Sequence, residues 1–386
     1  MDQIQSGIVF SKDPSLAGGA NRQYSLFVSF MIRWTGMNDT NLNDRQKKIL
    51  SILREMGSVS RLALGNKISP DASVSRITFI RDLNHLVSLN FIRVSGKGKN
   101  TTYGLVNTNP LLTYLDLDNY FKTETEARTV NKTFNDRVFS HLNNLYTQGE
   151  IDLWERSKKI FKEAGDKLDP SIYRRELERF IIELSWKSSQ IEGNTYSLIE
   201  TETLIKQNIK AVGHSDEEAV MILNHKKAFE VILDKKDSFK KLDVSDIVQL
   251  HQVLTNGLVT SGVRSQKVRI SGTRYEPLFD KHEIENVLRQ LIYLVNKTKF
   301  PPEKALILSI MIAYIQPFAD GNKRTSRMLS NAVLLAYDYF PLSYRSIDVN
   351  EYRSAMIVFY ETNNLYNFKR LYMKQLQFAI DNYFQE

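Results

Sequence analysis

The feature that most constrains this chain is a polar segment that stands between two long apolar stretches. Residues 305–315 are strongly apolar and long enough for a buried helix, and residues 328–335 continue a second buried helix. Between them, residues 316–327 read Gln-Pro-Phe-Ala-Asp-Gly-Asn-Lys-Arg-Thr-Ser-Arg. This order places a polar turn at the start of a helix inside a domain, where free backbone N–H groups and the positive helix end attract an anion. The sequence therefore predicts a mainly helical domain with an anion site in its interior.

The side chains of this segment suit a polyphosphate. Gly321 lets the backbone approach a ligand without a Cβ in the way. Arg324 and Arg327 are three residues apart, so they share one helical face and can both reach phosphate groups. Asp320 is placed to hold a magnesium ion that bridges phosphates. The alternative is a capped helix whose arginines form structural ion pairs, which does not account for the full run of residues.

The segment resembles the Fic motif, His-Pro-Phe-x-Asp-Gly-Asn-x-Arg-x-x-Arg. That family typically transfers AMP from ATP to a hydroxyl side chain of a target protein, and the resemblance extends from about residue 130 to the last residue of the sequence. It implies ATP and Mg²⁺ as cofactors, Phe318 as the anchor of the loop and Asp320 as the magnesium ligand. Asn322 and Arg324 would bind the α- and β-phosphates, and Arg327 the γ-phosphate. The implied nucleotide-binding residues are Gly321, Asn322, Lys323, Arg324 and Arg327.

Two positions depart from the family pattern. Gln316 stands where the family has its general-base histidine, and an amide has no usable basicity near pH 7. Because losing a general base costs about 10²–10⁴-fold in rate, we expect strongly reduced transfer. Lys323 stands where many members have glycine. The related Doc toxins carry lysine there and transfer phosphate, but they generally lack the second arginine, so Arg327 favours AMP transfer.

A second motif lies upstream, in residues 188–194 (Ser-Ser-Gln-Ile-Glu-Gly-Asn). It resembles the Fic inhibitory sequence, Ser/Thr-x-x-x-Glu-Gly/Asn, and implies an inhibitory helix near 180–194 with Ser188, Glu192 and Gly193 in inhibitory roles. Glu192 would pair with Arg327 and withdraw it from the γ-phosphate. In some relatives the same glutamate orients a water that removes AMP from targets. From the residues alone, the motif also fits an ordinary helix end with a glycine cap.

A third segment, residues 262–275, alternates like a β-hairpin that turns near Gly272. It resembles the Fic flap, which clamps a target segment by strand addition. A plain surface hairpin has the same pattern. The target-binding residues implied are Lys267, Val268, Arg269, Ile270, Ser271 and Gly272.

The N-terminal part of the chain is strongly basic. Residues 41–106 hold eleven Lys or Arg against four Asp or Glu, so +7 of the net charge of +8 lies there. This concentration indicates a polyanionic partner. The pattern predicts a helix from Asn43 to Gly57, a second over 60–67, and a third from about Ser73 that buries Ile77, Ile80, Leu83 and Val87. Strands at 91–94 and 101–103 follow, joined by a glycine-rich basic tip.

Three short helices before a basic hairpin resemble a winged helix-turn-helix. The third helix would offer donors to phosphates and base edges in a major groove, and the hairpin tip would reach backbone phosphates. The alternative is a winged helix used only for protein contacts. The candidate DNA-binding residues are Ser75, Arg76, Thr78, Arg81, Lys97 and Lys99.

The whole chain is predicted to be mainly α, with a helical Fic domain carrying a small β-hairpin flap after a winged helix-turn-helix. The expected divisions are an N-terminal extension of unclear role (1–40), the winged helix (41–108), a charged helical connector (109–130) and the Fic domain (131–386). Because the chain has no cysteine, disulfides and thiolate zinc sites are excluded. We see no signal peptide and no apolar run of the roughly 20 residues that span a bilayer, so we expect a cytoplasmic protein without membrane contact.

The leading functional hypothesis is therefore AMP transfer to a target protein with a modifiable hydroxyl, inhibited by Glu192 and impaired by Gln316. Two rivals stay open: a non-enzymatic DNA-binding regulator that senses nucleotide, and a hydrolase that removes AMP by using Glu192. The oligomeric state stays open too, a homo-oligomer included.

Overall fold

The computed structural model describes residues 42–68 and 74–385. The chain divides into two compact units, with the boundary between Thr108 and Asn109. The extension expected at 1–40 lies outside the described residues, and each unit is considered by itself. Among the residues that the structure describes, no helix combines the length and the apolar character needed to cross a bilayer.

Over its described residues, 42–68 and 74–108, the first unit contains three α-helices and a small antiparallel sheet. The elements are α2 (Asp44–Met56), β1 (Val59–Ser60), α3 (Arg61–Ile68), α4 (Arg76–Ser88), β2 (Ile92–Ser95) and β3 (Thr102–Leu105). In the sheet, β3 lies between β1 and β2, and Ile92 pairs with Leu105 while Ser95 pairs with Thr102. Asn43 begins α2 with a capping box to Gln46, which satisfies two backbone N–H groups at the helix start.

The buried face of α4 differs from the predicted one. Ile77 is 73% exposed and Val87 37% exposed, so the prediction that they are buried was wrong. The inward residues are Phe79, Asp82, Leu83 and Leu86, at the spacing of one helical face. The reason is Asp82, whose carboxylate accepts hydrogen bonds from Asn43, Arg45 and Gln46 at the start of α2. These bonds favour turning the charged residue inward and thereby set the rotation of the helix.

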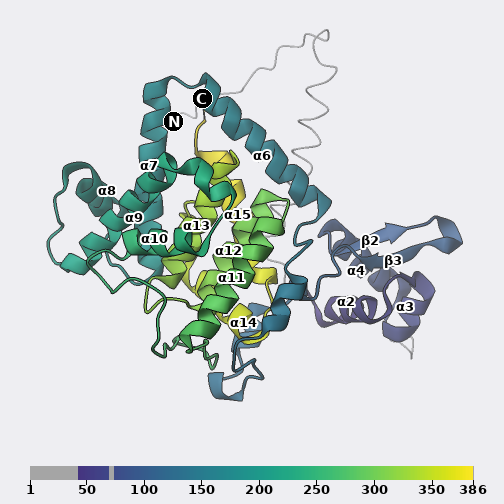
Figure 1. Ribbon diagram of the computed structural model, residues 1–386. Coiled ribbons are helices and arrows are strands. Elements are labelled where there is room, and N and C mark those ends of the chain that lie inside the picture. The colour runs from purple at the N-terminus through teal and green to yellow at the C-terminus, as the bar shows by residue number, and fades with distance from the viewer. Residues whose placement is uncertain (1–41, 69–73, 386) are drawn as a thin grey trace, which may run out of the picture. The chain divides into compact units, whose positions relative to one another are not determined.

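The second unit is built around two buried helices, which confirms the predicted mainly helical fold. Every residue of α12 (Pro301–Ile315) from Lys304 onward is buried, and so is every residue of α13 (Asn322–Ala336) except Lys323. Figure 1 shows α12 and α13 at the centre of this unit. Around them lie α6 (Gln148–Lys167), α7 (Pro170–Ile191), α8 (Leu198–Gln207), α9 (Asp216–Asp234), α10 (Val244–Leu254), α11 (Lys281–Lys297), α14 (Val349–Thr362) and α15 (Tyr366–Asn382).

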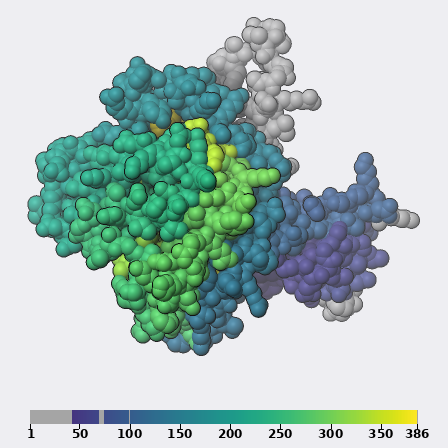
Figure 2. All heavy atoms as spheres, in the orientation of Figure 1, coloured from purple at the N-terminus to yellow at the C-terminus, as the bar shows by residue number. Residues whose placement is uncertain are grey.

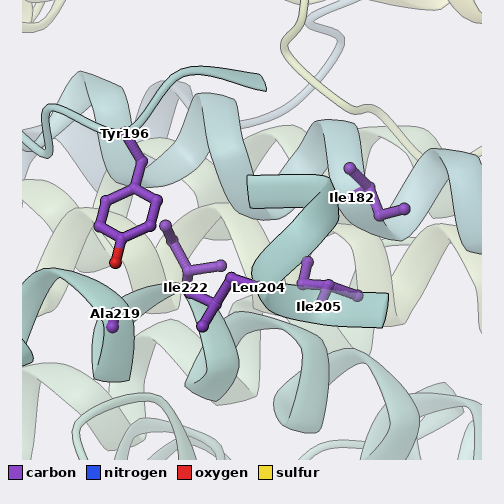
Figure 3. Packing of buried hydrophobic residues seen from close by; sticks show 6 residues of the cluster. All are labelled: Ile182, Tyr196, Leu204, Ile205, Ala219 and Ile222. Atoms are coloured by element: carbon purple, nitrogen blue, oxygen red, sulfur yellow. The ribbon is translucent and has the colours of Figure 1, made fainter. Parts of the chain in front are cut away.

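A separate apolar cluster holds α7, α8 and α9 together and thereby positions the end of α7. It consists of Ile182, Tyr196, Leu204, Ile205, Ala219 and Ile222 (Figure 3). Burying such side chains stabilises the packing by roughly 1.5–3 kcal/mol each. Figure 2 shows that the teal segments, which include these helices, form a continuous outer layer on one side of the unit. The end of α7 at Ile191 is therefore held in place, and the segment that follows it starts from a fixed position.

The connector predicted as a helix over 109–130 is helical only in part. It contains α5 (Leu117–Phe121) and short 3₁₀ turns at Pro110–Leu112 and Thr125–Ala127. The Tyr120 hydroxyl donates to the Glu361 carboxylate at 2.6 Å, and Arg128 Nη1 donates to the same carboxylate at 3.1 Å. Because Glu361 is 1% exposed and needs both donors, these tertiary bonds override the helical tendency of a charged segment.

Candidate functional site

The polar segment forms a tight loop between the two central helices. α12 ends at Ile315, Gln316 takes the left-handed conformation with φ 53°, and Gly321 begins α13 with φ 78°. A Cβ at position 321 would lie 2.7 Å from Thr255 Cγ2, so both the backbone angle and the space require glycine. The first N–H groups of α13 therefore open at the end of this loop, as an anion site requires.

Gln316 is held inside the loop by its own amide. Its Nε2 donates to the Ala313 carbonyl at 2.7 Å, and its Oε1 accepts from Asn322 Nδ2 at 2.9 Å. Asn322 also bonds the backbone N–H and the carbonyl of Phe318, both at 2.9 Å. Asn322 thus fastens the loop, and position 316 carries a neutral amide that can hydrogen-bond but cannot take up a proton near pH 7.

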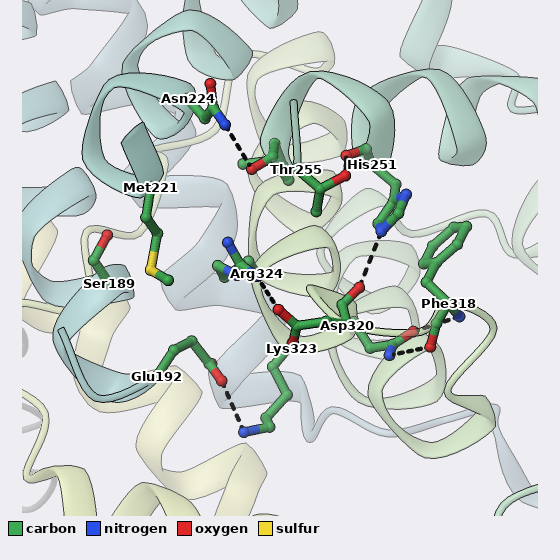
Figure 4. A network of polar contacts seen from close by, with 12 residues as sticks. Ser189, Glu192, Met221, Asn224, His251, Thr255, Phe318, Asp320, Lys323 and Arg324 are labelled. Carbon is green, nitrogen blue, oxygen red and sulfur yellow. Dashed lines mark hydrogen bonds and ion pairs between the residues drawn. The ribbon is translucent and has the colours of Figure 1, made fainter. Parts of the chain in front are cut away.

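His251, on α10, supports the loop from behind. Its ring stacks on Phe318 with centroids 3.7 Å apart, and its Nε2 lies 3.0 Å from the Asp320 carbonyl oxygen (Figure 4). A carbonyl can only accept, so Nε2 carries the proton. Burial lowers the pKa of His251, which favours the neutral ring. None of the histidines lies in the motif, but this one touches it, a contact that the sequence did not reveal.

Arg324 is buried beside this loop with unused donors. It is 1% exposed, and its Nη2 donates to Asp320 Oδ2 at 2.7 Å. Its Nε and Nη1 are buried without a hydrogen-bond partner. Each buried donor left without a partner costs roughly 1–3 kcal/mol, and more when the group is charged. This guanidinium is therefore suited to an anionic ligand that would pair its free donors. Figure 4 shows Asp320 and Arg324 facing each other at the start of α13.

The Asp320 carboxylate suits a metal ion only in part. The Asp320 side chain is 63% exposed, and it would give a metal ion a single carboxylate ligand. In the described part of the chain, no three His, Cys, Asp or Glu gather in a metal-binding arrangement. Mg²⁺ commonly uses one or two carboxylates together with substrate phosphates and water. The residues present therefore fit a magnesium ion brought by a nucleotide, not a metal centre built by the protein alone.

Glu192 reaches this site from the end of α7. Its Oε1 lies 2.8 Å from Arg327 Nη2, and its Oε2 lies 2.9 Å from Lys323 Nζ. Burial alone would raise the pKa of Glu192, but the two cations outweigh it and lower the pKa to about 2. The carboxylate is therefore ionised and bound by two positive groups. The pairing with Arg327 was expected, whereas the pairing with Lys323 was not.

The rest of the Arg327 guanidinium is also occupied, by Ser188 of the same segment and by Tyr352, to whose Oη the Nη1 donates at 3.4 Å. Its Nε donates to Ser188 Oγ at 3.0 Å and its Nη2 to the Ser188 carbonyl at 2.9 Å. His225 Nε2 lies 2.8 Å from Ser188 Oγ, and burial lowers the pKa of His225 to about 3, so the ring is neutral. Ser188 and Glu192 together leave Arg327 little capacity for another anion.

The ion pair predicts an acid-dependent loss of stability. The folded pKa of Glu192 is about 2, below its ordinary 4.5, so its contribution is complete above about pH 4.5 and is lost as the pH falls toward 2. We expect urea unfolding at pH 6 to show a wild-type chain more stable than Glu192→Gln, with an advantage that shrinks by up to about 3 kcal/mol by pH 2. An advantage independent of pH would contradict the pairing.

The segment predicted as a β-hairpin forms a loop without strands. Residues 262–280 turn at Ser271–Gly272, where Gly272 has φ 80°, but no ladder joins the two arms. The hairpin prediction was wrong in this respect, because the arms bond elsewhere: Arg264 to the motif, and Glu276 to Lys132 and Thr133, just after the connector. Exposure still alternates in this loop: Lys267, Arg269 and Ser271 are exposed, while Val268 and Ile270 are half-buried.

Comparison with known proteins places this site in a family. Residues 241–334 match the model of the Fic/DOC family, and this range contains both the loop at 262–280 and the motif helix α13. The chain contains a Fic domain. The family model covers the α10–α13 region, so Glu192 lies before the matched range.

Curated relatives are similar over part of their length. The protein adenylyltransferase Fic of Nematostella vectensis is 26% identical over 208 residues, which are 51% of this chain and 47% of the relative. Protein adenylyltransferase fic-1 of Caenorhabditis elegans is 26% identical over 161 residues, 39% of this chain and 31% of the relative. The match thus spans less than half the length of these relatives.

Solved structures share the fold. Fic-1 (residues 134–508) from C. elegans aligns with a TM-score of 0.52 and 20% identity, covering 61% of this chain and 71% of that one. A Fic-domain signalling protein from Bacteroides thetaiotaomicron aligns with a TM-score of 0.50 and 21% identity, covering 59% and 95%. At these identities the likeness shows that the helical arrangement around the Fic domain is shared.

The candidate DNA-binding residues lie in the first unit, apart from the Fic domain. Arg76 and Arg81 are exposed on α4, and Lys97 is exposed between β2 and β3. The Ser75 hydroxyl caps α4 by accepting from the Thr78 N–H at 3.2 Å, so these two hydroxyls already have local partners. Lys99 lies in the same connection as Lys97, and its side chain is outside the described part.

Proposed function

We propose that this chain is a self-inhibited Fic-type nucleotide-binding protein with Mg²⁺-dependent AMP transfer from ATP to a hydroxyl side chain of a target protein. The observation that carries the proposal is the buried Arg324, two of whose nitrogens, Nε and Nη1, have no partner among the described residues and lie beside the open start of α13. A buried cation at a helix N-terminus suits phosphate groups. The relatives named protein adenylyltransferases support the class of reaction.

The phosphates of the nucleotide and its magnesium ion each bind to different groups in the site. Arg324, Gly321 and Asn322 bind the inner phosphates at the start of α13. Asp320 would hold a magnesium ion brought by the nucleotide, and that ion would neutralise phosphate charge. Arg327 and Lys323 bind the terminal phosphate, in the place that the Glu192 carboxylate occupies now. Since a carboxylate and a phosphate oxygen make similar charge-assisted bonds, Glu192 acts as an internal competitor.

The chemical step needs a proton acceptor that this chain lacks. The target hydroxyl oxygen forms a bond to the α-phosphorus, the bond to the β-phosphate oxygen breaks, and pyrophosphate leaves. The hydroxyl proton must move to a base at position 316. Gln316 can accept a hydrogen bond there but not the proton, so transfer is slow in this chain.

Removal of Glu192 tests the nucleotide site. Calorimetric titration with ATP and Mg²⁺ is expected to show binding to Glu192→Ala on the order of 100-fold tighter than to the wild-type chain. Two charge-assisted bonds to Glu192 no longer have to break, and each is worth roughly 1.5–3 kcal/mol. The matched control is Glu202→Ala, which changes an exposed glutamate on α8. No heat of binding to Glu192→Ala would overturn the proposal.

The first unit supports a second function, DNA binding by a winged helix-turn-helix. Three helices followed by an antiparallel β2–β3 pair, with Arg76 and Arg81 exposed on α4, have the form that places a helix in a major groove. The net charge of +7 over residues 41–106 supplies the attraction to phosphates. A DNA-binding regulator would use the Fic domain as a nucleotide sensor.

A gel-shift titration tests this function with a random-sequence 30-base-pair duplex. Arg76→Ala with Arg81→Ala is expected to weaken binding about 10- to 100-fold and to lower the salt slope by about 2, since two phosphate contacts are lost. The matched control is Arg174→Ala with Arg175→Ala, two exposed arginines on α7. Equal affinities for the two pairs of variants would refute a DNA-binding role for α4.

A further inference from the structure

Arg264 is a buried cation without an acidic partner. It is 3% exposed, and it forms no ion pair with any residue in 42–68 or 74–385. Burying a charge without a counter-charge is costly, and even a buried ion pair is often no more stabilising than well-packed apolar residues of similar volume. Stability alone therefore does not explain an arginine at this position.

The guanidinium of Arg264 joins three carbonyl groups from different places. Its Nε donates to the Gln316 carbonyl at 2.7 Å, its Nη1 to the Gln266 carbonyl at 2.6 Å, and its Nη2 to the Leu278 carbonyl. Its backbone N–H also donates to the Pro317 carbonyl at 3.0 Å. Gln266 and Leu278 lie on the two arms of the loop at 262–280. One side chain thus connects both arms of this loop to the first residues of the motif.

The arms of the loop are not held together by backbone pairing. They form no strand ladder, so the distance between them is set by side-chain bonds, of which those of Arg264 reach both arms. The second arm is fastened separately just after the turn: Tyr275 Oη donates to the Tyr314 carbonyl at 2.9 Å, and Arg274 Nη1 to the Glu126 carbonyl at 2.6 Å. Those bonds fix the second arm near the turn, and Arg264 alone links the arms to residue 316 among the hydrogen bonds described.

We propose that Arg264 is a positioning residue that sets the distance between the target-binding loop and residue 316. This inference rests on the proposed function, in which the loop holds the target main chain and residue 316 faces its hydroxyl. Proton transfer and attack on phosphorus need reacting atoms about 3 Å apart, and a misplacement of about 1 Å can cost 100-fold. Five rigid donors on one planar group suit such a task better than a lysine does.

Hydrogen exchange tests the connection without any enzymatic activity. In the otherwise wild-type chain, Arg264→Met is expected to raise amide exchange both in 264–278 and in 316–322, while the thermal midpoint of the chain stays within a few degrees. Arg264→Lys should give an intermediate increase, because an ammonium group reaches fewer of the carbonyls. The matched control is Arg269→Met, which removes an exposed arginine from the same loop and should leave exchange at 316–322 unchanged.

Activity tests the positioning role in a Gln316→His, Glu192→Ala background. Self-adenylylation followed by mass spectrometry is expected to fall about 100-fold on adding Arg264→Met, with the KM for ATP unchanged and partial recovery in Arg264→Lys. The inference would be overturned if Arg264→Met left AMP transfer unchanged, or if the loss of transfer came entirely from a higher KM for ATP. It would also be overturned if amide exchange rose in the loop but not at 316–322. If the background itself transfers no AMP, the proposed function fails, and exchange at 316–322 still decides whether Arg264 holds the motif.

Discussion

Replacing Gln316 by His together with Glu192 by Ala is expected to raise AMP transfer at least about 100-fold above the wild-type chain. The first change supplies a group that accepts a proton near pH 7, in place of an amide that cannot. The second frees Arg327 and Lys323, which Glu192 now binds at 2.8 and 2.9 Å. Because each change removes a different obstacle, the single variants should stay much closer to the wild-type rate.

The backbone at position 316 accepts this change. Gln316 has φ 53°, and histidine is among the residues that tolerate the left-handed region. The measurement is mass-spectrometric detection of AMP on the chain itself or on proteins of a cell extract, over time and with ATP and Mg²⁺. The matched control is Gln316→Asn in the same Glu192→Ala background, which keeps an amide and should stay slow. Equal rates for the histidine and asparagine variants would show that position 316 is not the base position.

Arg327→Met in the Glu192→Ala background is expected to weaken ATP binding about 10- to 100-fold and ADP binding by less than about threefold. A charge-assisted bond to the terminal phosphate is worth roughly 1.5–3 kcal/mol, and ADP lacks that phosphate. Methionine fills much of the space that Arg327 occupies over the Tyr352 ring, and no carboxylate is left unpaired once Glu192 is gone.

Calorimetry with the two nucleotides measures this difference directly. Lys323→Met should show the same preference to a smaller extent, because Lys323 is partly exposed and its charge is better screened. Arg289→Met, on the exposed face of α11, is the control and should change neither affinity. Equal losses for ATP and ADP would place Arg327 at an inner phosphate and contradict the assignment of Glu192 as its competitor.

The motif region was predictable because its information is local. Two apolar helices around a polar turn, a glycine at the helix start and arginines three residues apart are read directly from the order of residues. The structure places Gly321 at φ 78° at the start of α13 and buries both helices. Helical period and backbone sterics act over a few residues, so a single sequence is sufficient to locate such a turn.

Elsewhere, tertiary bonds decided against the local pattern. Asp82 faces inward on α4 because donors from residues 43–46 satisfy its carboxylate, and Ile77 is exposed as a result. The connector breaks its helix to bring Tyr120 and Arg128 to Glu361. In the loop at 262–280, Arg264 bonds to Gln316 and Glu276 bonds to Lys132, and the two arms form no ladder with each other. In each case the partner lies more than thirty residues away or on another element, which local propensity does not register.

The sequence by itself determined that a helix tip in this chain carries a glycine, a carboxylate and two arginines, and that glutamine stands where the Fic motif has histidine. Only the tertiary structure decided that Glu192 also binds Lys323, that His251 supports the loop, and that Arg264 joins the motif to both arms of the neighbouring loop. The physical reason is that a buried charge or ring needs a partner at hydrogen-bonding distance, and the packing of whole helices chooses that partner.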